Sequence, residues 1–338
     1  MRAFAVLLKS LGLAVAALAI AGFAYQLAGD AYDAQYAPPA AEMISVEGHA
    51  VHFVCRGHGN RTYLLDSGAT VGAFEWDFVA PPLAQSARVC AFDRPGLGWS
   101  DDTSDAHDVR ALAEHIAIVV RAAHIPRPFI YVGHSLGADD AIVYRNLYPA
   151  DVAALVLLEP GIPRGILQKF HGTRAEAMAA PDCDIRCDFS EIAAFFGATR
   201  FAARISGLRH RANESRMTGE YLAQLFRPAQ ARAFSATLET MTKSAFEMES
   251  VKNFGDTPVL VLTSSRPEER GADETPAQFQ NGRSEQLAWY AILAHMSSRG
   301  SGPVTIQNTN HAGMVMTPKG AFELVAAISD FLARERVH

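Results

Sequence analysis

The chain has 338 residues, about twice the roughly 150 residues of a typical domain, so one large domain or a domain with a sizeable insertion is expected. Hydrophobic residues make up 49% of it and charged residues 20%, which argues against a disordered or collagen-like chain. The 30 Lys and Arg residues against 36 Asp and Glu residues give a formal net charge of −6. With no long basic run beside that charge, nucleic acid is a poor candidate partner.

The first element in chain order is an uncharged, mostly apolar stretch from Ser10 to Gly29. Its length at about 1.5 Å per helical residue is roughly 30 Å, the thickness of a bilayer core. The flanking charges are Arg2 and Lys9 before it and Asp30 and Asp33 after it. Positive charge on the short N-terminal side favours retention of that end in the cytoplasm. Residues 1–35 are therefore predicted to be a membrane anchor that places the rest outside the cytoplasm, on the periplasmic side in a Gram-negative cell. A cleaved signal peptide and a secreted protein are the alternative.

After the Pro38-Pro39 break, short β-rich segments alternate with helical ones. The predicted strands are 43–46, 51–55, 62–65, 89–92, 129–132, 154–158, 259–263 and 304–307, and the predicted helices are 106–124, 136–148, 284–297 and 318–334. A continuous apolar run such as 155–158 suits burial on both faces, as in a parallel sheet between helices. The predicted class is α/β, with a mostly parallel central sheet flanked by helices.

Residues 161–256 interrupt this alternation, because they are helix-prone and rich in Ala, Arg and Phe and contain no strand pattern. They are predicted to form a helical cap inserted into a core of residues 36–160 and 257–338. The apolar residues of the cap are expected to form its own core, with the lining of an acyl or alcohol pocket as the alternative. They include Phe189, Phe195, Phe196, Phe201, Leu222 and Phe226.

The four cysteines fall into two pairs. Cys183 and Cys187 lie in a loop flanked by Pro and Asp, and this spacing is compatible with a small-loop disulfide in an oxidising compartment. No nearby pair of histidines completes a zinc pattern. Cys55 and Cys90 lie in apolar, strand-like runs, where two buried free thiols are expected, and a bridge between them depends on a distance that the sequence does not give.

The chemistry centres on Gly133-His134-Ser135-Leu136-Gly137. This fits the Gly-x-Ser-x-Gly pattern of a nucleophile elbow, in which a Ser occupies a sharp strand-to-helix turn. A β-branched and aromatic run enters the motif and a helix-competent run leaves it. Ser135 is therefore the candidate nucleophile, and His134 is expected to point away and shape the turn.

A Ser hydroxyl needs a base to remove its proton, and an imidazole suits this because its pKa is about 6.5. His311 follows the last predicted strand and precedes the last helix. Loops at that edge of an open α/β sheet converge on the site, so His311 is the predicted base.

At these residues the chain resembles the α/β-hydrolase superfamily. The likeness is carried by residues 133–137, by Asp93-Arg94-Pro95-Gly96-Leu97-Gly98-Trp99-Ser100 and by His311 before a C-terminal helix. The stretch from Gly48 to Pro160 is similar to a branch of bacterial, N-terminally anchored members. The resemblance implies an α/β-hydrolase fold with a helical cap and a serine hydrolase with a Ser-His-acid triad.

In that superfamily the acid follows either the strand after the nucleophile helix or the strand after the cap. Glu159 fits the first place, and residues 263–267 show no carboxylate at the second. Glu159 is therefore the predicted acid, and Asp273 and Glu268 are the alternatives.

The oxyanion formed during attack needs preorganised donors. The backbone N–H groups of Leu136, directly after the nucleophile, and of Ala69, in the turn after the third strand, are predicted to supply them. Asp139 and Asp140 are expected to cap the nucleophile helix on its solvent side, with tuning of substrate preference close to Ser135 as the alternative. Asp93 and Arg94 are expected to form a structural pair beside the site.

These residues predict cleavage of an ester, thioester or amide in a small-molecule acyl substrate through a seryl acyl-enzyme, with no metal or organic cofactor required. Ser135 argues against epoxide hydrolysis and dehalogenation, which in this fold use an Asp nucleophile. Two alternatives remain: acyl transfer to an alcohol or lipid, and a non-catalytic binding protein that keeps the scaffold. The natural substrate and the oligomeric state do not follow from the sequence.

Overall fold

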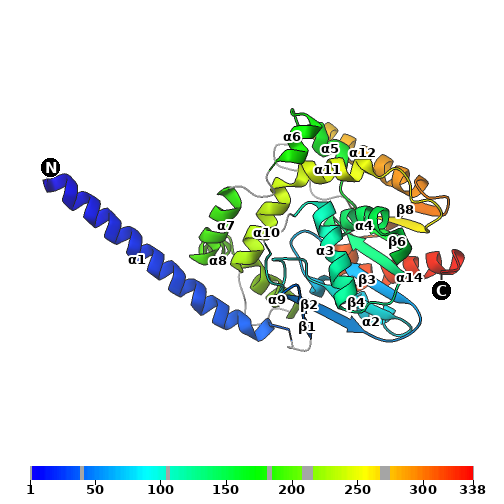
Figure 1. The fold of residues 1–338 in the computed structure, drawn as a ribbon, viewed down its shortest axis with the longest axis horizontal. Coiled ribbons are helices and arrows are strands. Elements are labelled where there is room, and N and C mark those ends of the chain that lie inside the picture. The colour runs from blue at the N-terminus through cyan, green and yellow to red at the C-terminus, as the bar shows by residue number, and fades with distance from the viewer. Residues whose placement is uncertain are drawn as a thin grey trace.

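The computed structural model describes residues 2–38, 42–103, 107–180, 185–207, 216–266 and 275–337. An eight-stranded sheet of order β1-β2-β4-β3-β5-β6-β7-β8 lies at its centre (Figure 1). The strands are β1 (Met43–Val46), β2 (His49–Arg56), β3 (Thr62–Asp66), β4 (Arg88–Phe92), β5 (Phe129–His134), β6 (Val152–Leu158), β7 (Val259–Ser264) and β8 (Gly300–Ile306). Pairing is antiparallel for β1 with β2 and for β2 with β4, and parallel from β4 to β8. The predicted mostly parallel sheet is confirmed.

Helices cover both faces of the sheet. On one face, α3 (Val109–Ala122), α4 (Leu136–Leu147) and α12 (Pro276–His295) share a core with Phe129 and Tyr131 of β5. On the other face, α2 (Ala80–Leu83), α13 (Gly313–Met316) and α14 (Pro318–Arg334) share a core with Ile130 and Val132. Successive side chains of a strand point to opposite faces. A strand covered on both sides therefore reads as an unbroken apolar run.

Between β6 and β7 the regular elements of the described chain are helices. They are α5 (Pro163–Leu167), α6 (Arg174–Ala179), α7 (Ile185–Phe195), α8 (Ala198–Ile205), α9 (Arg216–Leu225), α10 (Pro228–Glu239) and α11 (Met241–Ser250). Helix α7 packs on α10, and α11 packs on α5 and α3. These helices lie beyond the carboxyl ends of β6 and β7, where loops from the core converge.

The N-terminal apolar segment forms one long helix, α1 (Arg2–Asp33), which projects from the rest of the molecule (Figure 1). It contains a window of mean hydropathy 2.2, long and apolar enough to cross a membrane by length and composition. Side chains from Phe4 to Leu18 are exposed, whereas Gln26 and Asp33 are buried against the helices that follow β6. The predicted apolar helix is present, and its last third is packed against protein.

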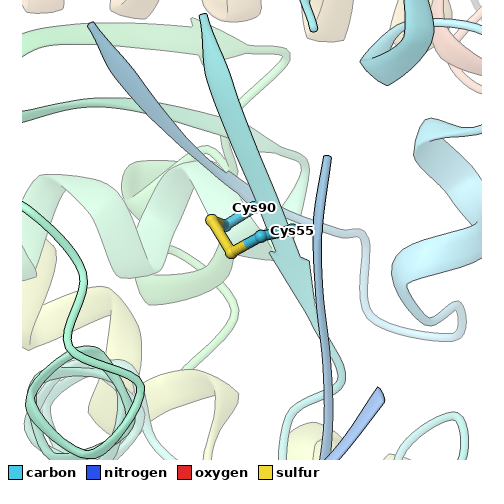
Figure 2. The surroundings of a disulfide bond; sticks show 2 residues. All are labelled: Cys55 and Cys90. Carbon is cyan, nitrogen blue, oxygen red and sulfur yellow. A yellow bond between two sulfur atoms is a disulfide. The ribbon is translucent and has the colours of Figure 1, made fainter. Parts of the chain in front are cut away.

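Cys55 and Cys90 form a disulfide between β2 and β4 (Figure 2). The expectation of two free thiols was therefore wrong. The antiparallel register places the two residues directly opposite each other, with their Cα atoms 4.1 Å apart, a separation that a disulfide can bridge. Of the other pair, Cys183 lies outside the described residues, and Cys187 is disulfide-bonded.

Candidate active site

Ser135 occupies a tight turn between β5 and α4, with φ 54° and ψ −120°. A positive φ is strained for a residue with a side chain and persists only where the surroundings impose it. The two motif glycines make the turn possible. A Cβ on Gly133 would lie 2.2 Å from the carbonyl oxygen of Gly137, and one on Gly137 would lie 2.3 Å from that of Asp66. The Gly-x-Ser-x-Gly spacing thus follows from close backbone contacts on both sides of Ser135.

The five residues predicted for the site line one cavity of about 1450 Å³. They come from four chain segments: Ala69 follows β3, Ser135 and Leu136 join β5 to α4, Glu159 follows β6, and His311 follows β8. Parallel strands bring their carboxyl ends to the same sheet edge. The structure therefore brings the predicted nucleophile, base, acid and oxyanion donors to one place, and their catalytic roles stay predictions.

Glu159 is bound through both of its oxygens. Its Oε2 accepts a hydrogen bond from Nδ1 of His311 at 2.7 Å, and its Oε1 accepts from the hydroxyl of Thr263 and from the backbone N–H and hydroxyl of Ser264 at 2.8–2.9 Å. Burial raises the pKa of the Glu159 carboxyl, but the hydrogen bonds from His311 and Ser264 outweigh burial and lower it to about 2. Glu159 is therefore a carboxylate at neutral pH, oriented toward the imidazole.

The two alternative acids, Asp273 and Glu268, lie outside the described residues. In residues 263–267, where the sequence shows no carboxylate, Ser264 at the end of β7 donates to Glu159 instead. Arg283 of α12 adds a cation 3.7 Å from Oε1 of Glu159. The end of β7 thus supports the carboxylate that β6 presents.

The two predicted oxyanion donors lie on the cavity wall beside Ser135. Leu136 is the first residue of α4, and N–H groups in the first turn of a helix have no acceptor within it. In the facing loop, the backbone N–H of Gly68 donates to Glu75 at 2.9 Å, and its carbonyl accepts from Arg94 at 2.6 Å. Gly68 is thereby fixed from both sides, which holds the neighbouring Ala69 against the cavity.

Sequence reasoning missed the group that links this loop to the elbow. Glu75 accepts from Gly68 through Oε2 and lies 2.7 Å from Nδ1 of His134 through Oε1. The His134 ring in turn lies 4.5 Å from the ring of His311, centroid to centroid. His134 was expected to point away from the site; it is not among the residues that line the cavity, but its ring packs against the predicted base, which was not expected. No local pattern around Glu75 indicates its contact with a residue 59 positions later.

Asp139 and Asp140 were expected on the solvent side of α4, but both are buried. Asp140 accepts from Arg94 at 3.0 Å. Asp139 lines the cavity and accepts from the backbone N–H of Gly161 at 2.7 Å. Burial raises the pKa of the Asp139 carboxyl to about 7, although the Gly161 hydrogen bond opposes this. The first turn of α4 is therefore covered by Arg94 and by the start of the inserted segment at Gly161, and its two carboxylates point into protein.

Asp93 and Arg94 do not pair with each other. Arg94 forms salt bridges with Asp66 and Asp140, both at 3.0 Å. Asp93 lies 2.8 Å from Nδ1 of His52 and accepts from backbone N–H groups, including that of Trp99 at 2.7 Å. Consecutive side chains point in different directions, so each residue fixes a different part of the loop beside the site.

The cavity extends from Ser135 between α5, α10, α11 and α12. Its apolar lining includes Ile166, Phe170, Phe234, Leu238, Met241 and Phe279. Of the inserted apolar residues singled out in the sequence, Leu222 and Phe226 form a small buried cluster. Phe189, Phe195, Phe196 and Phe201 are instead exposed and are not among the lining residues. These four residues were expected to form the core of the cap or, alternatively, to line a pocket, and both expectations were wrong.

Among the described residues, no group of three or more His, Cys, Asp or Glu side chains could hold a metal ion. The polar groups around Ser135 are instead arranged in pairs, with Glu159 on His311 and Glu75 on His134. Such an arrangement can hold and transfer a proton between a hydroxyl and an imidazole.

Comparison with known proteins places this geometry in a family. A family model described as "alpha/beta hydrolase fold" matches residues 64–239, more than half of the chain. Over 81 residues the chain is 35% identical to the bifunctional esterase/perhydrolase DCH of Acinetobacter calcoaceticus, which covers 24% of this chain and 29% of that protein. The chain spans only 29–38% of the length of the first curated relatives that it matches, so their activities carry over only as proposals.

Solved structures share the fold at low identity, and two of them illustrate the similarity to this chain. A membrane phospholipase A, described as a bacterial virulence factor, is 19% identical with a TM-score of 0.58 and full coverage of both chains. The epoxide hydrolase CorEH is 16% identical with a TM-score of 0.60, covering 86% of this chain and 98% of its own. At such identities the likeness shows the architecture alone, and the chemistry has to be argued from the site.

Proposed function

This chain belongs to the alpha/beta hydrolase fold family, and we propose that it is a serine hydrolase that cleaves an ester, thioester or amide through an acyl-enzyme on Ser135. The observation that carries the proposal is the hydrogen-bonded pair of Glu159 and His311 in the same cavity as Ser135. The hydrolase fold and the esterase among its relatives support the same class of activity.

The chemistry follows from the protonation states of this pair. Because Nδ1 of His311 donates to the Glu159 carboxylate, Nε2 is the nitrogen that can accept a proton. In the proposed reaction, Oγ of Ser135 attacks the carbonyl carbon and its proton passes to Nε2. The backbone N–H groups of Leu136 and Ala69 stabilise the oxyanion. His311 then protonates the leaving group, and water repeats the sequence to release the acid and restore Ser135.

The cavity supports a substrate with a sizeable apolar part. Its volume of about 1450 Å³ exceeds the roughly 300–1,000 Å³ of a common small-molecule site. Most of its apolar lining comes from the segment between β6 and β7, and Phe279 of α12 adds to it. We therefore assign residues 161–256 as a cap that contains most of the substrate site, and residues 36–160 and 257–338 as the core that contains the reacting groups.

The same proposal includes the location of the protein. Residues 1–35 serve as a membrane anchor, and the catalytic domain lies outside the cytoplasm. The length and hydropathy of α1 support the anchor. The Cys55–Cys90 disulfide supports an oxidising compartment. Secretion after removal of the segment is the alternative.

A series of 4-nitrophenyl esters of increasing acyl length tests the proposal. The full chain in detergent is expected to hydrolyse them, and Ser135→Ala to lower kcat by about 10⁴-fold or more. Ser284→Ala, which changes an exposed Ser on α12, is the matched control and is expected to retain wild-type rates. Retention of a tenth of the activity by Ser135→Ala would refute the assignment of the nucleophile. Adding an alcohol acceptor then separates acyl transfer from hydrolysis by product, and no turnover of any ester would favour the binding-protein alternative.

A further inference from the structure

Large apolar side chains gather on the outer face of α7 and α8. Phe189, Ile192, Phe195, Phe196, Phe201 and Ile205, here called the α7–α8 patch, are between 39% and 71% exposed. Their spacing of three or four residues along each helix places them on one side of it. The opposite side of α8 is buried through Arg200 and Ala203. Contiguous exposed apolar surface of this kind marks an interaction site.

The patch is attached directly to the N-terminal helix. The ring of Phe195 stacks on Phe23 of α1, with centroids 5.0 Å apart. The backbone of Phe196 lies so close to Gly22 that a Cβ there would be 2.4 Å from its carbonyl oxygen. Figure 1 shows α7 and α8 beside the C-terminal half of α1, between it and α10.

Polar contacts fix the level at which the two parts meet. Arg200 of α8 donates to Asp33 at 2.7 Å and to Asp30 at 2.9 Å. Its guanidinium also stacks on Phe226 at 4.6 Å from the ring centroid. Because Arg200 is buried, α8 and the end of α1 form one packed unit, and the patch has a fixed position relative to the apolar part of α1.

That position can be expressed as a depth in the membrane. The uncharged part of α1 ends at Asp30, and Phe23 precedes Asp30 by seven residues, about 10 Å along a helix axis. A side chain that stacks on Phe23 therefore lies up to about 10 Å farther into the bilayer than the charges of Asp30 and Arg200. Amphipathic helices on a membrane bury their apolar face by about 5–10 Å.

We propose that the α7–α8 patch inserts into the leaflet of the lipid bilayer from which α1 emerges. The inference rests on the anchor assigned under the proposed function, and it is independent of the chemistry of Ser135. We infer that the patch contacts lipid because it adjoins the exposed apolar surface of α1, which the proposed anchor places in the bilayer. The inserted patch makes two helices of the cap part of the membrane contact, so the substrate site and the lipid surface share one structural unit.

Tryptophan quenching by brominated lipid tests the depth directly. Full-length Phe189→Trp, Phe201→Trp and, as the matched control, Phe322→Trp on α14 (76% exposed) are reconstituted in phosphatidylcholine vesicles with acyl chains brominated at carbons 6 and 7. With the emission of the wild-type tryptophans subtracted, we expect at least twofold quenching of the new tryptophan at positions 189 and 201. At position 322 we expect no quenching.

The possible failures are separable. If the protein does not float with the vesicles in a density gradient, the anchor fails and the inference with it. If it floats but positions 189 and 201 are quenched no more than position 322, the inference alone is overturned. Burial of the patch in a second copy would be seen as a dimer whose patch tryptophans stay unquenched, and this also overturns it. Turnover of a short water-soluble ester at the wild-type rate shows that each variant is folded and that Ser135 chemistry is unaffected.

Discussion

Glu159 is the residue on which the geometry of the proposed triad depends. Its side chain links the ends of β6 and β7 to the loop that carries His311, through three donors on one oxygen and one on the other. A carboxylate held this firmly orients the imidazole before substrate binds. In the proposed reaction it also stabilises the imidazolium that forms when the Ser135 proton is taken up.

Glu159→Gln therefore removes charge while it keeps shape. We expect kcat for a soluble ester to fall by about 10³- to 10⁴-fold with little change in KM, because the lost interaction is made in the transition state. Thr263→Val is the matched control, since it removes one donor to the same carboxylate and leaves Ser264 in place. A Glu159→Gln variant within tenfold of the wild type would rule out Glu159 as the triad acid.

Asp139 provides a prediction on stability. Burial raises the pKa of its carboxyl to about 7 in the folded protein, above the unfolded value of about 3.9. Between these values the folded state holds a proton that the unfolded state has released, so the wild-type free energy of unfolding falls as pH rises from about 4 to 7. Asp139→Asn removes this dependence.

The measurement is denaturant unfolding of Asp139→Asn and wild type at pH 4.5 and pH 8. Relative to wild type, the free energy of unfolding of the variant is expected to rise by about 3 kcal/mol from pH 4.5 to pH 8. Asp188→Asn, at an exposed position on α7, should show no such change. If the free energies of unfolding of Asp139→Asn and wild type differ by the same amount at both pH values, the assigned pKa is contradicted.

For single residues, the sequence predicts the functional groups that neighbouring residues in the chain indicate. The strained turn at Ser135 needs glycines two positions away on each side, and His311 is indicated by its place after the last strand. The burial of Asp140 depends on Arg94, 46 positions earlier, and the contact of Glu75 with His134 spans 59 positions. A residue pattern along a helix cannot show such partners, so the solvent-facing expectation for Asp139 and Asp140 failed.

Among the elements, strands inside the sheet were predicted closely because burial on both faces leaves an apolar run. The edge strand β8 begins at Gly300, ahead of the expected 304, because Gly-Ser-Gly-Pro carries no apolar signal. Helix α12 begins at Pro276, eight residues before the expected start at 284. Thr275 and Gln278 form a capping box there. The first half of the helix is mostly exposed and polar, so it lacks the periodic apolar residues by which a helix is recognised in a sequence.

The pairing of β2 with β4 leads to a prediction about the disulfide. The bridge closes a separation of 35 residues, for which the chain-entropy estimate is about 4 kcal/mol and the usual range about 2–4 kcal/mol. Cys55→Ser combined with Cys90→Ser should lower the free energy of unfolding by this amount and leave kcat for a soluble ester unchanged, because neither residue lines the cavity. Denaturant unfolding measures the first effect. A loss below about 0.5 kcal/mol would contradict it.

For the whole molecule, the order of N-terminal apolar helix, core, inserted helices and core follows from hydropathy and from the interruption of the strand pattern. How α1 meets the inserted helices does not, because Phe23 and Phe195 are 172 positions apart and stack only in the folded chain. The sequence pattern of phenylalanines at helical spacing is the same whether their side chains face a protein core or lipid. For this reason the exposed patch of α7 and α8 could be recognised only from its surface.

The central claim is that Ser135 is the nucleophile of this hydrolase, and covalent labelling tests it most directly. Full-length protein in detergent is treated with a fluorophosphonate, and the modified peptide is identified by tandem mass spectrometry. We predict a single adduct on Ser135, absent from Ser135→Ala and formed more slowly by Glu159→Gln. An adduct at another residue with Ser135 unmodified, or no adduct in a preparation that hydrolyses esters, would contradict the account.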